Sequence, residues 1–161
     1  MNGVAAEREA AAGMVHVGRR AAWLRATVAE RAGQAATLAV LVGLIGLGLA
    51  LVPSPTGAGT HCQLGLPACG MLETTGLPCP TCGVTTAFCL AAHGRLVEAL
   101  VTQPFGFALF LLVAGGALGL AAALVSGRSV LPVLTPWTLA AGGTALMLLL
   151  LAAWTYKLAT A

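Results

Sequence analysis

The chain has 161 residues, of which 58% are hydrophobic and only 8% are charged, and its formal net charge is +3. A soluble domain averages about 25% charged residues, so this chain has too few charged side chains for a water-facing surface of normal size. Its apolar residues lie in long uninterrupted blocks, which indicates that the bilayer is the solvent for most side chains. We therefore predict an all-α membrane protein.

The N-terminal segment, residues 1–34, is basic. Five arginines precede the first apolar block: Arg8, Arg19, Arg20, Arg25 and Arg31. Two interpretations fit residues 19–32: a helix lying among lipid head groups, or a basic tail without fixed structure. Basic arms that bind nucleic acid are usually denser in charge and less apolar. We expect this segment to meet the lipid bilayer and expect no nucleic-acid partner.

Three uncharged runs predict transmembrane helices, over residues 35–52, 104–125 and 137–156. A helix over the first run would be about 27 Å long, close to the thickness of a hydrocarbon core. The third run ends with Trp154 and Tyr156 and is followed by Lys157. An aromatic ring and a cation of this kind anchor a helix at the membrane surface.

The positions of the basic residues predict the orientation. Most arginines precede the first span, and cytoplasmic segments carry the excess of positive charge. We expect a cytoplasmic N-terminus in the plasma (inner) membrane of a bacterium, with residues 53–103 outside the cytoplasm and the loop 126–136 inside it. Small-residue pairs such as Gly115 and Gly119 predict close helix packing. Packing within the chain is the simpler interpretation; a membrane protein partner or a homo-oligomer is the other.

The loop 53–103 contains every cysteine. They are Cys62, Cys69, Cys79, Cys82 and Cys89. Within this loop, residues 83–92 are mostly apolar but too few to cross a bilayer. We predict a short re-entrant or interfacial helix there, between the first and second spans.

A C-x-x-C motif, Cys79-Pro80-Thr81-Cys82, begins just before the predicted short helix. Three kinds of chemistry use this spacing. A reactive dithiol is one, because the positive end of a helix lowers the pKa of a thiol. A structural disulfide and half of a tetrahedral zinc site are the others.

The remaining cysteines are candidate partners of this motif. Cys62 and Cys69 are candidates to form a disulfide, either with each other or with a cysteine of the motif. They are also candidate ligands of a zinc site, although their spacing is wider than that of a compact zinc knuckle. Cys89 lies about 10.5 Å from Cys82 along a continuous helix, too far for a disulfide. We expect Cys89 to be a small buried hydrophobe.

The sequence TGLPCPTCGVT, residues 75–85, resembles the motif of the small bacterial membrane proteins grouped as domain of unknown function 2752. That motif runs approximately T-G-x-x-C-P-x-C-G-x-T-R-A, followed by a glycine near a turn and by Asn-Pro at the mouth of a transmembrane helix. Besides the two cysteines, the matching residues in this chain are Pro80, Gly83, Thr85, Gly94 and Pro104.

The resemblance covers about residues 69–125 and includes Cys69, which is similar to an upstream cysteine of many members, whereas Cys62 has no counterpart. Two residues depart from the pattern: Thr86 stands where the family usually has Arg, and Gln103 where it usually has Asn. If that Arg binds an anion or stabilises a thiolate, the role is lost or altered here. The resemblance implies a membrane architecture and no established activity.

Three functions fit these residues. A non-enzymatic scaffold or partner-binding protein is favoured, because Glu73 and Glu98 in the loop have no evident catalytic partner. The alternative is a membrane thiol–disulfide oxidoreductase with Cys79 as nucleophile and Cys82 as resolving thiol, relayed by Cys62 or Cys69. The third is a zinc-binding membrane protein that uses the same sulfurs.

Overall fold

The computed structural model describes residues 26–133 and 135–160, and this part of the chain contains helices and no β-strand. The predicted all-α fold is confirmed. Residues 19–32, for which an interfacial helix and a basic tail were the two alternatives, lie mostly outside the described residues. In chain order the elements are α2 (Val28–Ala50), η1 (Thr60–Leu64), α3 (Gly70–Thr75), α4 (Val84–Ala92), α5 (Leu96–Thr102), α6 (Pro104–Ser126), η2 (Leu131–Val133) and α7 (Pro136–Ala159).

Three helices of the described residues, α2, α6 and α7, are long and apolar enough to cross a membrane. They confirm the three predicted spans, with different ends. Helix α2 begins at Val28 because Thr27 and Glu30 form a capping box, in which each side chain accepts a hydrogen bond from the backbone N–H of the other. A second capping box, formed by Thr135 and Thr138, begins α7.

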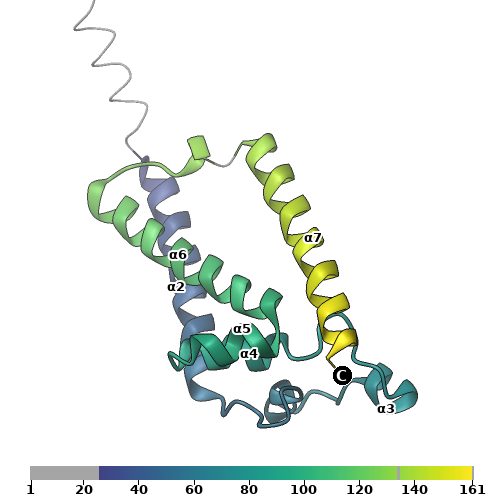
Figure 1. Ribbon diagram of the computed structural model, residues 1–161. Helices are drawn as coiled ribbons and strands as arrows, with labels where there is room; N and C mark the ends of the chain where they lie inside the picture. The colour runs from purple at the N-terminus through teal and green to yellow at the C-terminus, as the bar shows by residue number, and fades with distance from the viewer. Residues whose placement is uncertain (1–25, 134, 161) are drawn as a thin grey trace, which may run out of the picture.

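Two short helices, α4 and α5, lie side by side across one end of the α2–α6 pair (Figure 1). The chain reverses between them at Gly94, whose φ of 78° is a left-handed conformation that favours glycine. Their contact surface is a core of small and apolar residues, Ala87, Leu90, Ala91 and Ala99, against which Phe107 and Phe110 pack. The short helix expected over residues 83–92 is confirmed.

Close packing of α4 against the spans depends on glycines at two positions. A Cβ atom at Gly106 of α6 would lie 2.6 Å from the carbonyl oxygen of Val84, and one at Gly48 of α2 would lie 3.0 Å from the ring of Phe88. The predicted packing pair, Gly115 and Gly119, has open space instead, with no atom within 4 Å of an added Cβ. The sequence therefore indicated glycine-mediated packing but not the glycines that provide it.

Helix α7 stands apart from the α2–α6 pair along most of its length and meets the rest of the chain at its C-terminal end (Figure 1). There the Tyr156 hydroxyl donates to the carbonyl oxygen of Val101 at 3.2 Å, and the Lys157 ammonium donates to that of Thr102 at 3.2 Å. These carbonyls end α5, where the helix dipole is negative. Tyr156 and Lys157, which we expected to anchor α7 at the membrane surface, thus also attach this helix to the C-terminal end of α5.

The close approach at Gly106 generates a prediction. We expect Gly106→Ala to lower the free energy of unfolding by about 1–3 kcal/mol, the usual cost of overpacking, because the Val84 carbonyl is rigid backbone. The measurement is the thermal unfolding midpoint in detergent. Gly115→Ala on the same helix is the control, and its added methyl meets no neighbour. Equal midpoints for the two variants would contradict the packing described for α4.

Candidate cysteine site

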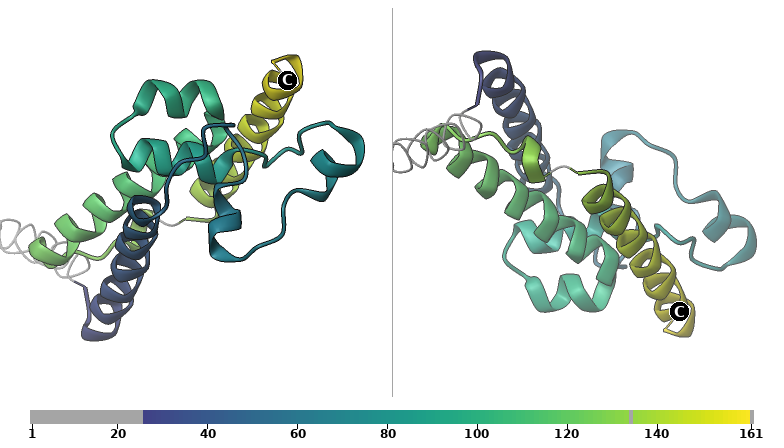
Figure 2. Two further views of the ribbon diagram at one scale, coloured as in Figure 1. Left: turned by 90° about the horizontal axis from the view of Figure 1, so that it is seen from below. Right: turned by 90° about the horizontal axis from the view of Figure 1, so that it is seen from above.

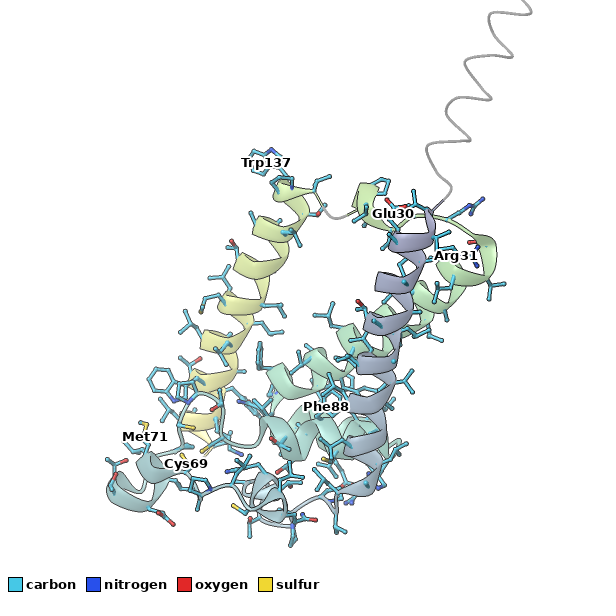
Figure 3. All side chains as sticks on the ribbon, turned by 180° about the vertical axis from the view of Figure 1, so that it is seen from behind. Glu30, Arg31, Cys69, Met71, Phe88 and Trp137 are labelled. Atoms are coloured by element: carbon cyan, nitrogen blue, oxygen red, sulfur yellow. The ribbon has the colours of Figure 1, made fainter. Side chains whose placement is uncertain are left out.

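Three of the five cysteines converge at the end of the molecule that carries the α4–α5 pair. The Sγ atoms of Cys69, Cys79 and Cys82 all lie within 4.8 Å of one another, and those of Cys79 and Cys82 are 3.2 Å apart. Figure 3 shows Cys69 beside the C-terminal end of α7, at the opposite end of the molecule from Glu30 and Arg31. We refer to these three residues as the cysteine cluster.

The cluster is assembled from two separate turns of the chain. Cys69 directly precedes α3, in a loop that extends away from the α4–α5 pair (Figure 2). Cys79 and Cys82 lie in the turn before α4, where the backbone N–H of Cys82 donates to the carbonyl oxygen of Cys79 at 3.0 Å. This turn sets the spacing of the two motif thiols, and the loop through α3 brings the third thiol to them.

Two hydrogen bonds hold the turn of the motif on both sides of Cys79. The indole N–H of Trp154 on α7 donates to the carbonyl oxygen of Pro78 at 3.0 Å. The side-chain amide of Gln103, at the mouth of α6, donates to that of Pro80 at 3.1 Å. Gln103 is fully buried, and a buried carbonyl left without a donor costs about 1–3 kcal/mol. Both later spans therefore fix the position of Cys79.

Gly83 ends the motif in a conformation that other residues rarely adopt. Its φ is 89°, and a Cβ atom there would lie 2.6 Å from the carbonyl oxygen of Gly57. Both the left-handed backbone and the contact favour glycine. The Cys82-Gly83 step thus passes directly against the loop that follows α2, which explains the glycine of the motif in physical terms.

A buried pair of hydroxyls includes Thr86, which stands where the motif that this chain resembles usually has arginine. The Oγ1 atoms of Thr86 and Thr60 are 2.8 Å apart, and Thr60 also accepts a hydrogen bond from the backbone N–H of Ser54. Both threonines are almost completely buried. Thr86 therefore fastens α4 to the loop after α2 with a neutral contact. Its neighbour Thr85, a motif residue, borders an apolar cavity beside α2.

The surroundings of the cluster separate the acidities of its thiols. The backbone N–H of Leu72 and the thiols of Cys82 and Cys79 stabilise the Cys69 thiolate and lower its pKa to about 7. Burial, reinforced by hydrogen bonding to the neighbouring thiols, raises the pKa of Cys82 to about 12. Near neutral pH, Cys69 of the metal-free cluster is therefore partly ionised to the thiolate, whereas Cys82 stays protonated.

The other two cysteines lie outside the cluster. Cys62 is exposed, with its Sγ atom 3.9 Å from Nε2 of His61. Cys89 on α4 is only 1% exposed, which confirms the prediction that it is a small buried hydrophobe. A cavity of about 240 Å³ adjoins the cluster, and His61 and Glu73 line it together with Cys69 and Cys82.

Three convergent thiols support two kinds of chemistry. Thiolates are soft ligands that bind zinc and similar ions, and a close pair of thiols beside a thiolate is suited to disulfide exchange. The sequence named Cys62 and Cys69 together as candidate partners, and only Cys69 joins the motif. Trp154 and Gln103 were not predicted to hold the motif. The available signal for such contacts was the pair of prolines beside Cys79, because the backbone carbonyls of this turn need hydrogen-bond donors.

The comparison with protein families gives one match. The model of a family described as protein of unknown function (DUF2752) matches residues 69–116. The match begins at Cys69 of the cluster and ends within α6, so it confirms the resemblance seen in the motif. The comparisons with curated proteins and with solved structures give no match.

The separated acidities predict how the thiols react. In metal-free protein we expect iodoacetamide to modify Cys69 before Cys82 at about pH 7, because the pKa of Cys69 is about 7 and that of Cys82 about 12. The rate at Cys69 should rise with pH and level off above about pH 8. Mass spectrometry of alkylated peptides measures both rates. Equal labelling of the two thiols at neutral pH would contradict the lower pKa of Cys69 relative to Cys82.

Proposed function

We propose that this protein is a non-enzymatic membrane scaffold whose loop is held together by a zinc ion bound to Cys69, Cys79 and Cys82. The observation that carries the proposal is the convergence of these three Sγ atoms within 4.8 Å. Three sulfur ligands from two separate turns would cross-link the loop through α3 to the turn before α4. Structural zinc sites stabilise small loops in this way.

The geometry fits the ion. Zinc–sulfur bonds of about 2.3 Å in a tetrahedron place ligand sulfurs about 3.8 Å apart. In the cluster the Sγ atoms of Cys79 and Cys82 are 3.2 Å apart, and all three Sγ atoms lie within 4.8 Å of one another. Soft thiolate donors select zinc over magnesium or calcium. A fourth ligand would come from water, or from His61 or Glu73, which line the adjoining cavity.

Zinc binding would be coupled to the protons of the cluster. Binding requires the thiolate form of each ligand. Since burial holds the pKa of Cys82 at about 12 without metal, the ion must displace that proton near neutral pH, and the apparent affinity would rise with pH. The ion would also compensate the desolvation that makes the free Cys82 thiolate unfavourable.

The charges support an orientation. Arg31 and Arg128 lie at the end opposite the cysteine cluster, where Arg31 donates to the carbonyl oxygen of Leu124 and the backbone of Arg128 accepts from Gln34. In the sequence, four further arginines precede α2, so most arginines of the chain lie within or before this helix. The positive-inside rule then places the end with Arg31 and Arg128 in the cytoplasm. We propose a bacterial plasma membrane protein with a cytoplasmic N-terminus and an external cysteine cluster.

The exposed length of α7 supports the partner-binding part of the proposal. Added side chains at Gly142 and Gly143 would meet no atom within 4 Å, and most of this helix lacks neighbours in the described residues. Small residues let helices approach closely within a bilayer. We propose that a membrane protein partner, or a second copy of this chain, packs on this face.

A second candidate, thiol–disulfide exchange, is favoured by the lowered pKa of Cys69. Its thiolate would attack a disulfide between Cys79 and Cys82 at Cys79, form a Cys69–Cys79 bond and release the electron pair on Cys82. An external protein dithiol or disulfide would complete the cycle. Cys82 is a poor leaving group, because a thiol of high pKa leaves slowly. This step places exchange second to zinc.

The test is the zinc content of purified protein. We expect about one zinc per chain, lost in Cys82→Ser and kept in Cys62→Ser, the control for an exposed thiol outside the cluster. Inductively coupled plasma mass spectrometry measures the metal, and alkylation before and after graded reduction measures the thiols. If the purified protein contains no metal, and Cys79 and Cys82 form a disulfide that mild reductants open, the result would contradict zinc binding and favour thiol–disulfide exchange.

A further inference from the structure

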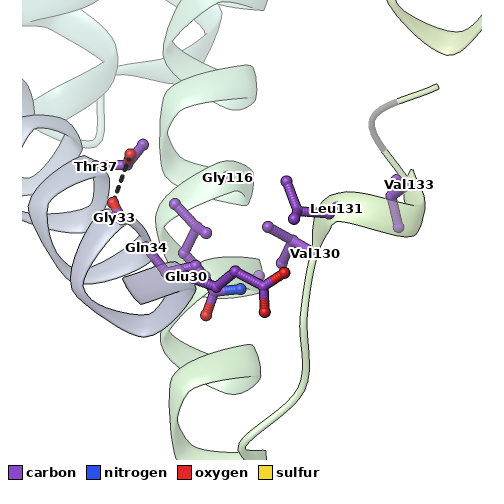
Figure 4. Close-up of a pocket in the computed structure, with 10 residues that line it drawn as sticks. Glu30, Gly33, Gln34, Thr37, Gly116, Val130, Leu131 and Val133 are labelled. Atoms are coloured by element: carbon purple, nitrogen blue, oxygen red, sulfur yellow. Dashed lines mark hydrogen bonds between the residues drawn. The ribbon is translucent and has the colours of Figure 1, made fainter. Parts of the chain in front are cut away.

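A second site lies at the opposite end of the molecule from the cysteine cluster. A cavity of about 670 Å³ opens there between α2, α6 and the segment that carries η2. Its walls are mostly apolar, formed by Gly119 and Leu120 of α6 and by Leu131 and Val133. Figure 4 shows the last two on the η2 segment, facing α2 and α6. None of these residues belongs to the cluster or to the matched motif.

The side-chain amide of Gln34 is buried in this cavity, and its oxygen receives no hydrogen bond from the described residues. Gln34 of α2 is only 6% exposed and lines the cavity. Its Nε2 donates to the carbonyl oxygen of Arg128 at 3.3 Å, which settles the orientation of the amide. Its Oε1 has no hydrogen-bond partner among residues 26–133 and 135–160. Buried acceptors are nearly always satisfied, so this oxygen marks a place where a bound molecule would supply a donor.

The remaining polar groups of the cavity give the charge of that molecule. The Glu30 carboxylate points toward Val130 and Leu131 (Figure 4), and one of its oxygens accepts from the backbone N–H of Thr27 at 2.7 Å. The Thr37 hydroxyl already donates to the carbonyl oxygen of Gly33 at 2.9 Å. Among the described lining side chains, the cavity thus offers acceptors and one negative charge, which match a cation with N–H groups.

The site also suits an acyl chain and a phosphate. The apolar wall runs along α6, a membrane-spanning helix, from Gly119 toward Gly116. Arg31 and Arg128 lie at the same end of the molecule as Glu30. An ammonium beside Glu30 and Gln34, a phosphate near these arginines and a chain along α6 describe one zwitterionic phospholipid.

We propose that this cavity binds a phospholipid with a primary ammonium head group, of the phosphatidylethanolamine class. The ammonium donates to Gln34 Oε1 and pairs with Glu30, and one acyl chain lies against Gly116 and Gly119. A trimethylated head group has no N–H to donate. Selectivity for phosphatidylethanolamine over phosphatidylcholine therefore follows from the unpaired oxygen, whereas the apolar wall alone would accept either lipid.

The test is native mass spectrometry of the full chain in detergent, titrated with dioleoyl phosphatidylethanolamine, phosphatidylcholine or phosphatidylglycerol. We expect phosphatidylethanolamine to bind roughly tenfold more tightly than the other two, as for one hydrogen bond to a charged group. Gln34→Met, of similar volume but without the amide oxygen, should bind phosphatidylethanolamine and phosphatidylcholine about equally, because both head groups still carry the positive charge that pairs with Glu30.

Two matched glycine variants test the location of the acyl chain. Gly119 lines the cavity and Gly115 does not, and an added Cβ meets open space at both. Gly119→Leu should weaken phosphatidylethanolamine binding roughly tenfold, whereas Gly115→Leu should leave it unchanged. Equal binding of the three lipids by wild type, absence of bound lipid, or equal effects of the two leucines would overturn the proposal.

Discussion

The hydrogen bonds to the carbonyl oxygens of Pro78 and Pro80 are the interactions on which the rest of the structure depends. A carbonyl in this proline-bounded turn has no helical partner, so its donor must come from elsewhere. Trp154 supplies one from α7 and Gln103 supplies the other from the mouth of α6. Because Cys79 lies between the two carbonyls, the packing of the spans sets the geometry of the cysteine cluster. The Trp154 contact also attaches α7 to the molecule, together with the hydrogen bonds of Tyr156 and Lys157.

The sequence was sufficient where a local physical rule decides the structure. Uncharged runs of bilayer length predicted all three spans, because no other environment accepts them. Residues 83–92 were too few to cross a bilayer and contain the short helix α4, and Gly94 forms the turn between α4 and α5. The ends of the spans were less accurate. Helix α2 starts well before residue 35 because the capping box of Thr27 and Glu30, rather than hydropathy, decides where the backbone becomes helical.

What the sequence did not predict depends on contacts between distant residues. The spacing of the cysteines left Cys62 and Cys69 equivalent, and only the path of the loop through α3 brings Cys69 to the motif. The sequence showed Thr86 as a departure from the motif but gave it no role, because its partner, Thr60, lies 26 residues earlier in the chain. The packing glycines, Gly48 and Gly106, carry no sequence signal that separates them from the open Gly115.

The most direct test of the account is zinc K-edge X-ray absorption on the purified full-length protein, because it reports the ligands of the ion rather than its presence. If the cysteine cluster binds zinc, the spectrum should show about three sulfur neighbours at about 2.3 Å and one lighter ligand. A spectrum with only oxygen and nitrogen neighbours would show that any bound zinc lies elsewhere. The convergence of Cys69, Cys79 and Cys82 would then have to be explained without a metal.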